Sequence, residues 1–142
     1  MIARVDHLDL VVADLERSLE FYRGLLGPLG WAREERIEGE RGEEVVYLGP
    51  EPPDRPIAIS LRAAQTTGEG RYDRYSVGLH HLALMVDSRE VVLERHRWLL
   101  DRGAEIESPP QEYTYAPGYY AVFFRDPDGL KLEIVHVPPQ AA

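Results

Sequence analysis

Two histidines stand at the same place in a repeated sequence pattern. His7 and His81 are each followed by Leu-x-Leu-x-Val, and Glu133 lies in an apolar segment near the C-terminus. Two imidazoles and one carboxylate form a three-ligand metal site that leaves coordination positions open. Open positions allow a bound ion to polarise a substrate oxygen or to activate water. The sequence therefore predicts a catalytic metal site built from His7, His81 and Glu133.

Each of these residues also has a purely structural interpretation. A lone histidine in a strand is more often an ordinary core or surface residue than a ligand. A carboxylate between Leu132 and Ile134 is harder to explain in this way, because burying an unpaired charge is costly. The chain has no cysteine, so a metal must take nitrogen and oxygen ligands, and Fe(II), Mn, Ni, Co and Zn all stay open. Glu133 could instead act as a catalytic base if it leaves the metal.

The first half of the chain must position His7. Apolar and polar residues alternate over 4–12, which predicts a half-buried strand. Asp14 stands at the N-cap position of a helix that begins at Leu15, and Gly27-Pro28 ends this helix. A Pro-rich turn is predicted over 49–54. Three further strands are predicted, over 33–37, 44–48 and 57–61.

The second half repeats this order. A strand is predicted over 80–86, and Asp87 or Ser88 caps a helix over about 89–102 that Gly103 closes. Strands over 119–125 and 130–136 are joined by Asp126-Pro127-Asp128-Gly129, a strong turn signal. The two modules, about 1–64 and 78–138, are joined by a polar linker over 65–77. We expect one domain over 1–142, in which two small modules share a buried interior.

Composition excludes several functions. The net charge of −9 disfavours a nucleic-acid partner, because neutralising phosphates requires a basic surface. No apolar run is long enough to span a bilayer, and the N-terminus has no apolar signal-peptide segment. These features predict a cytoplasmic protein with no membrane partner.

The pattern from His7 through Ser18, Phe21-Tyr22 and Leu26-Gly27 resembles the vicinal oxygen chelate superfamily. This group includes glyoxalase I, bleomycin resistance proteins, fosfomycin resistance enzymes, methylmalonyl-CoA epimerase and extradiol dioxygenases. The segment from Gly118 to Glu133 is similar to the closing motif of the family. The resemblance covers nearly the whole chain and is specific for the superfamily, not for one member.

The resemblance implies an α+β fold, in which two βαβββ modules form an incomplete mixed β-barrel. It implies a divalent metal ion, a small-molecule substrate and a homodimer, with the metal on His7, His81 and Glu133. A fourth ligand position of the family falls on Ser60, or on Ile59 if the alignment slips by one residue. Neither supplies a good ligand, so the resemblance implies three protein ligands.

Departures from individual family members narrow the function. Val11 stands where glyoxalase I carries an arginine that contacts glutathione, so a glutathione adduct is not the expected substrate. Ala121 and Phe123 replace hydroxyl side chains of the fosfomycin enzymes. Extradiol dioxygenases need a further His and Tyr near the metal, for which His80, Tyr115 and Tyr119 are candidates, although alternation places His80 outside the site.

Several residues are expected to line a substrate cavity. Tyr115 lies in a Tyr- and Pro-rich stretch that is predicted to be a loop, either closing over an apolar ligand or simply packed. Asp9 shares a strand face with His7, and Lys131 shares one with Glu133. The expected cavity residues are Asp9, Ser60, Tyr115, Tyr119, Ala121, Phe123 and Lys131.

The sequence thus predicts a divalent-metal-dependent enzyme of the glyoxalase or dioxygenase type, acting on a small oxygenated molecule. The alternative is a metal-free protein of the bleomycin-resistance kind, which would sequester a ligand in the same cavity. The acidic charge and the tyrosines favour the alternative, whereas the three ligand positions favour the enzyme.

Overall fold

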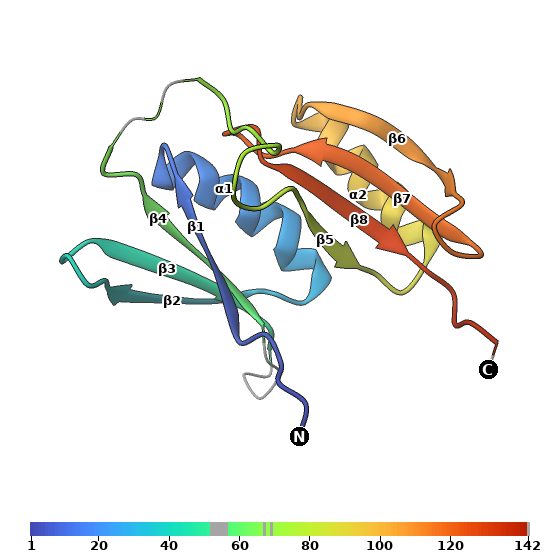
Figure 1. Cartoon of the computed structure of the whole chain (residues 1–142), viewed down its shortest axis with the longest axis horizontal. Helices are drawn as coiled ribbons and strands as arrows, with labels where there is room; N and C mark the ends of the chain where they lie inside the picture. Colours follow the sequence, from blue (N-terminus) through green and yellow to red (C-terminus); the bar gives the residue numbers. More distant parts are fainter. Residues whose placement is uncertain (52–56, 67, 69, 142) are drawn as a thin grey trace. The chain divides into compact units, whose positions relative to one another are not determined.

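The structure is a computed structural model that describes residues 1–51, 57–66, 68 and 70–141 (Figure 1). The chain divides into two compact units, Met1–Glu69 and Gly70–Ala142. The predicted linker over 65–77 spans this boundary, and its residues 67 and 69 lie outside the described part. The predicted turn over 49–54 also lies partly outside it, since 52–56 are not described.

The first unit has the element order β-α-β-β-β. Its strands form one sheet in the order β1-β4-β3-β2, in which β1 is parallel to β4 and the other pairs are antiparallel. The helix α1 connects β1 to the meander and packs on β3 and β4. The elements are β1 (His7–Val12), α1 (Leu15–Leu26), a 3-10 turn (Gly27–Leu29), β2 (Arg33–Glu38), β3 (Glu44–Gly49) and β4 (Ala58–Ala63).

The second unit repeats this topology. Its sheet has the order β5-β8-β7-β6, with β5 parallel to β8, and α2 packs on β6, β7 and β8. The predicted α+β fold of two βαβββ modules is therefore confirmed, with two separate four-stranded sheets, neither of which closes into a barrel. The elements are β5 (Leu82–Met85), α2 (Arg89–Asp101), β6 (Ile106–Tyr113), β7 (Tyr119–Arg125) and β8 (Lys131–His136).

Local sequence signals explain the helix boundaries. The Asp14 carboxylate accepts a hydrogen bond from the Arg17 N–H, and the Ser88 hydroxyl accepts one from the Val91 N–H. Both caps satisfy an N–H group that has no partner within the helix. Of the two predicted caps of α2, Ser88 is the one used. Within the described part of the chain, no helix is long and apolar enough to cross a membrane.

Each helix covers one face of its own sheet with apolar side chains. Alternate strand residues point to that face, where they meet the apolar stripe of the helix. The fully buried residues of the first unit include Leu19, Tyr22, Leu26, Leu48, Ile59 and Leu61. Those of the second unit include Val92, Leu99, Val122, Phe124, Leu132 and Ile134.

The turn between β7 and β8 forms as predicted. The Asp126 carboxylate accepts hydrogen bonds from the N–H groups of Asp128 and Leu130, both at 2.9 Å. Gly129 has a φ of 91°, which a residue with a side chain rarely adopts. This turn sets the register in which Glu133 faces Phe123 across β7 and β8.

The loop predicted for the Tyr- and Pro-rich stretch forms only around Tyr115, on the turn at 114–118, and is wrong for the residues before it. Residues 106–113 form the edge strand β6, which pairs with β7, and Tyr113 lies directly opposite Tyr119. The register shifts between Ser108 and Gln111, across Pro109-Pro110. Proline lacks an N–H group and is tolerated in a sheet chiefly at an edge or a bulge, so the strand survives at the cost of regular pairing.

Candidate functional site

The second unit brings His81 and Glu133 together. His81 immediately precedes β5, and its Nε2 lies 3.2 Å from Oε2 of Glu133 on β8. Two ligands that each lie about 2.1 Å from one ion and about a right angle apart are separated by roughly 3 Å. Glu133 is only 2% exposed, although its neighbours in β8 are apolar. The donor types and the spacing of this pair fit a metal ion.

Both members of the pair have a further partner. The Tyr119 hydroxyl donates to Oε1 of Glu133, and Nδ1 of His81 lies 2.8 Å from Nδ1 of His80. Burial, followed by the bond to Glu133, raises the pKa of the Tyr119 hydroxyl, so this group stays protonated and remains a donor at neutral pH. Glu133 is thus held at one oxygen while the other faces His81.

The strand predicted over 80–86 begins later in the structure, and this changes the surroundings of His80. Strand alternation over 80–86 placed His80 on the face opposite His81, away from the site. The strand β5 begins only at Leu82, so alternation does not govern residues 80 and 81. The ring centroids of the two histidines are 5.0 Å apart, with an edge-to-face arrangement at 77°.

The site pair lies on a largely apolar face of the second sheet, which we call the open face. Its buried centre is formed by Ala121, Phe123 and Val135, and Tyr113 and Tyr119 pack against it. The Phe123 ring lies 6.3 Å from the ring of His81. The open face therefore carries one buried carboxylate on an apolar floor, which excludes water from one side of the site.

Tyrosines continue this floor beyond the sheet. Tyr115, on the turn after β6, stacks on Tyr113 at 5.3 Å and 6°, and meets Tyr119 edge to face at 5.2 Å. Tyr115 is 70% exposed. The predicted cavity residues Tyr115, Tyr119, Ala121 and Phe123 therefore belong to one continuous cluster in the second unit.

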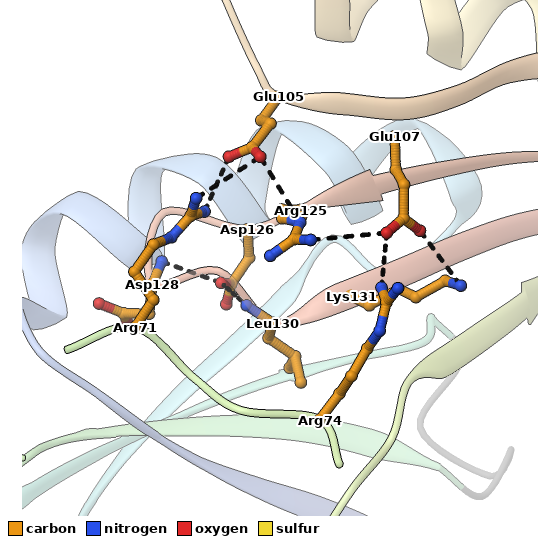
Figure 2. A network of polar contacts seen from close by, with 9 residues as sticks. All are labelled: Arg71, Arg74, Glu105, Glu107, Arg125, Asp126, Asp128, Leu130 and Lys131. Carbon is orange, nitrogen blue, oxygen red and sulfur yellow. Dashed lines mark hydrogen bonds and ion pairs between the residues drawn. The ribbon is translucent and has the colours of Figure 1, made fainter.

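Lys131 joins the open face to a network of charged side chains (Figure 2). Its Nζ lies 4.5 Å from the centre of the Phe123 ring and 3.1 Å from the Glu107 carboxylate. Arg74 also binds this carboxylate at 2.6 Å, and Arg125 approaches it at 3.5 Å. Desolvation, the largest single effect, would raise the pKa of Glu107, but hydrogen bonds from Arg74 and Lys131 outweigh it and lower that pKa.

The charge of Glu107 is expected to stabilise the fold in a pH-dependent way. Because its pKa is lower in the folded protein than the unfolded value of about 4.3, the contribution is present above that pH and is lost as the pH falls through the folded pKa. We expect Glu107→Gln to lower the free energy of unfolding by about 0.5–1 kcal/mol at pH 7. Urea denaturation at successively lower pH should show the gap between the variant and the wild type shrinking once the pH falls below about 4.3.

The exposed pair of Glu105 with Arg71 provides a comparison. Both side chains are more than half exposed, and such a pair is worth little because water and salt screen it. Glu105→Gln is therefore expected to have a smaller effect than Glu107→Gln at pH 7. A gap for Glu107→Gln that persists unchanged at pH 3 would contradict the assignment of this stability to the ion pairs.

The first unit surrounds His7 with a different set of residues. The exposed His7 ring places Nδ1 2.7 Å from Asp6 and Nε2 3.9 Å from Asp9. Asp9 accepts a hydrogen bond from the buried Ser60 hydroxyl and forms an ion pair with Arg62 at 2.6 Å. The carboxylate nearest His7 on this face is therefore already bound by neighbouring side chains.

Strand register makes the two units directly comparable. In the first unit, Asp9 follows His7 by two residues and pairs with Ser60 on the last strand. In the second unit, Ala83 follows His81 by two residues and pairs with Glu133 on the last strand. Ser60 and Glu133 therefore occupy equivalent positions. The alignment of Ser60 with Glu133 is confirmed, and the alternative slip to Ile59 is excluded. A hydroxyl replaces the carboxylate in the first unit.

The metal ligands predicted from sequence are distributed over both units. His81 and Glu133 lie together in the second unit, and His7 begins β1 in the first. Among the residues that the structure describes, no three His, Asp or Glu side chains gather closely enough to hold a metal ion by themselves. His80 adds no third ligand, because its Nδ1 faces Nδ1 of His81.

Comparison with known families identifies this arrangement. The model of the Glyoxalase/Bleomycin resistance protein/Dioxygenase superfamily matches residues 4–134. The chain belongs to this superfamily. In this chain, the superfamily fold consists of two βαβββ units. Each unit has a histidine at its first strand, and the second unit has a glutamate on its last strand.

Relatives in the superfamily have different activities. A lactoylglutathione lyase of Salmonella typhimurium is 30% identical over 134 residues, which cover 93% of this chain and 91% of the relative. A superfamily domain from Frankia sp. has a TM-score of 0.78 and 27% identity, covering 96% of this chain and 98% of that one. The fosfomycin resistance protein FosX of Listeria monocytogenes shares the fold, with a TM-score of 0.66 and 19% identity. The match covers 96% of this chain and 95% of that one.

Proposed function

We propose that this superfamily member is a divalent-metal-dependent enzyme of the glyoxalase or dioxygenase type, acting on a small oxygenated molecule in the cytoplasm. Its metal would be held by His81, Glu133 and His7. The observation that carries the proposal is the pairing of Nε2 of His81 with a glutamate that is 2% exposed on an apolar sheet face. A carboxylate in such a position requires a cationic partner or several hydrogen bonds.

The surroundings of the pair support a metal site. Metal ligands are commonly oriented by a second set of hydrogen bonds, which fixes their rotamers and raises their basicity. Tyr119 binds the glutamate and His80 binds the histidine, each on the atom turned away from the His81–Glu133 contact. Both ligands are thus oriented before an ion binds, as expected for a functional site.

The third ligand in this proposal is His7. It begins the first strand of its unit, as His81 immediately precedes β5, and the sequence after both is Leu-x-Leu-x-Val. We propose a homodimer, in which His7 comes either from the same chain or from the second copy. Ser60 in place of a fourth ligand leaves positions open for substrate oxygens.

A bound divalent ion would polarise substrate oxygens or activate water. The chain's own residues then define the substrate. The floor around Phe123 favours an apolar or planar portion, and the Lys131 cation at its margin favours a negatively charged or strongly polar group. The exposed Val11 offers no charge to a glutathione carboxylate, so we propose a substrate other than a glutathione adduct.

Metal analysis tests the proposal directly. The chelator-treated protein is reconstituted with Fe(II), Mn(II), Ni(II), Co(II) or Zn(II), and bound metal is measured after removal of excess ion. We expect one ion per chain for the wild type and near-complete loss for His81→Ala and His7→Ala. His96→Ala, which changes a histidine on α2, serves as the control and should keep the metal. A wild-type protein that binds none of the five ions would overturn the proposal.

The tyrosine cluster supports a second candidate function. Stacked and edge-to-face rings of Tyr113, Tyr115 and Tyr119 form a surface suited to an aromatic ligand. A metal-free sequestering protein of the bleomycin-resistance kind would use this surface without the histidines. Tight binding of a cationic aromatic drug that is unchanged in His7→Ala would favour this candidate over the enzyme.

A further inference from the structure

The segment that precedes His81 is tied to the second sheet by charged side chains. We call residues 70–80 the strap. Arg71 binds the Glu105 carboxylate at 2.7 Å, and Arg74 binds the Glu107 carboxylate at 2.6 Å (Figure 2). Both glutamates lie at the start of β6 or just before it. The strap is therefore anchored to the same unit that carries the candidate metal ligands.

The strap also closes on itself before it reaches the site. The Tyr72 hydroxyl donates to the backbone carbonyl of Leu79, which precedes His80. The ring of Tyr75 meets the His80 ring nearly edge to face, with centroids 5.2 Å apart. His80 is consequently held between an aromatic ring of the strap and the imidazole of His81.

The contact between the two histidines determines where their protons lie. In a hydrogen bond between two neutral imidazole nitrogens, one nitrogen donates and the other accepts. In the proposed site, Nε2 of His81 faces Glu133 and binds the metal, so it carries no proton. The proton of His81 must then lie on Nδ1, from which it is donated to Nδ1 of His80 at 2.8 Å. The proton of His80 lies on its Nε2.

We propose that His80 is a positioning residue that fixes the tautomer and the ring orientation of the metal ligand His81, and that the strap holds His80 in place through Tyr75 and Arg74. This inference rests on the proposed function. Such an outer partner is usually a carboxylate, a backbone carbonyl or water. Here the adjacent histidine performs the task, so the site depends on the conformation of a segment that lies outside the sheet.

Two substitutions separate the hydrogen bond from the ring contact. His80→Asn keeps an acceptor, because the Asn Oδ1 lies at nearly the same distance along the side chain as the histidine Nδ1. His80→Phe keeps a ring that can pack on Tyr75 but removes the acceptor. Outer partners of ligands typically contribute 10–100-fold in metal affinity. We expect His80→Phe to weaken Zn²⁺ binding by this factor and His80→Asn to remain within about threefold of the wild type.

The Nδ1 proton of His81 gives a readout that a merely structural role would not move. In the Zn²⁺-loaded wild type, with the metal on Nε2, ¹H–¹⁵N NMR of the imidazoles should show the Nδ1–H of His81 protected from exchange with water by its hydrogen bond to His80. His80→Phe should lose this protection, whereas His80→Asn should retain it. His96→Asn is the control, with no expected change in Zn²⁺ affinity or in the His81 signals.

The outcomes distinguish this inference from the proposed function. If His80→Phe binds Zn²⁺ as tightly as the wild type, or leaves the His81 signals unchanged, the role of His80 is refuted while the metal site stands. If the wild type binds no Zn²⁺, the proposed metal function fails for this ion, and the positioning role, which acts on the metal-bound His81, is overturned with it.

Discussion

Glutamine in place of Glu133 is expected to abolish metal binding and to make the metal-free protein more stable. The substitution keeps the size of the side chain and replaces a buried charge by a neutral amide. Its oxygen still accepts from Tyr119, and its NH₂ group can donate to His81, so the hydrogen bonds survive. The anionic ligand is lost, and metal affinity should fall by at least about 100-fold, beyond the range known for outer partners.

The gain in stability follows from the 2% exposure of Glu133. A charge taken out of water costs several kcal/mol, which His81 and Tyr119 offset only in part when no ion is bound. We expect Glu133→Gln to raise the free energy of unfolding of the metal-free protein by about 1–2 kcal/mol, measured by urea denaturation at pH 7.

The exposed Glu112 on β6 is the matched control, because Glu112→Gln changes the same side chain at the surface, where its ion pair with Arg89 is screened by water. This variant should alter neither metal affinity nor unfolding beyond about 0.5 kcal/mol. A Glu133→Gln protein that retains metal, or that is less stable than the metal-free wild type, would show that this carboxylate is a structural element of the sheet.

Two adjacent phenylalanines should differ strongly when each is changed to alanine. Phe124 is fully buried on the face of the second sheet that α2 covers, whereas Phe123 lies on the open face. Truncation of a buried phenylalanine leaves a cavity and removes its burial energy, so we expect Phe124→Ala to cost about 3–5 kcal/mol. At Phe123 the gap opens beside the half-buried Lys131 and His81, where water can enter, and the cost should be about 1–2 kcal/mol.

Urea denaturation of the two variants measures this difference. Phe123→Ala should in addition weaken ligand or metal binding at the open face, and Phe124→Ala should not do so under conditions where it remains folded. The reverse order of stabilities would mean that the open face, and not the face under α2, forms the main core of the second unit.

Much of the fold was predictable because it is encoded by short-range signals. The Asp14 and Ser88 caps fix helix starts through single hydrogen bonds, and alternation over the first strand separates His7 from Leu8. The equivalence of Ser60 and Glu133 could also be predicted, because the two units repeat one topology and their strands pair in the same register.

The errors arose where a local signal gave the wrong answer. Pro109-Pro110 indicated a loop, yet β6 tolerates both residues because it is an edge strand, a property that depends on the sheet and not on the segment. Alternation failed at His80 because the strand starts two residues later. Neither error could be corrected from the segment alone.

The contacts that orient the site were not predictable from spacing. Tyr119 was placed on the correct face, but its hydrogen bond to Glu133 depends on the rotamers of both side chains. Likewise, Asp9 was expected near His7, whereas its partners Ser60 and Arg62 lie some fifty residues away in the chain. Such long-range choices are decided by packing.

The prolines of β6 also protect the second sheet against unwanted assembly. An unpaired sheet edge offers a row of N–H and C=O groups to any extended chain, and this is a common route to aggregation. Pro109 and Pro110 carry no N–H group, and the register shift between Ser108 and Gln111 interrupts the regular pairing of β6, which is the edge strand of the sheet. Extended peptides should therefore find no continuous template there, so that self-association through strand addition is blocked along this margin of the molecule.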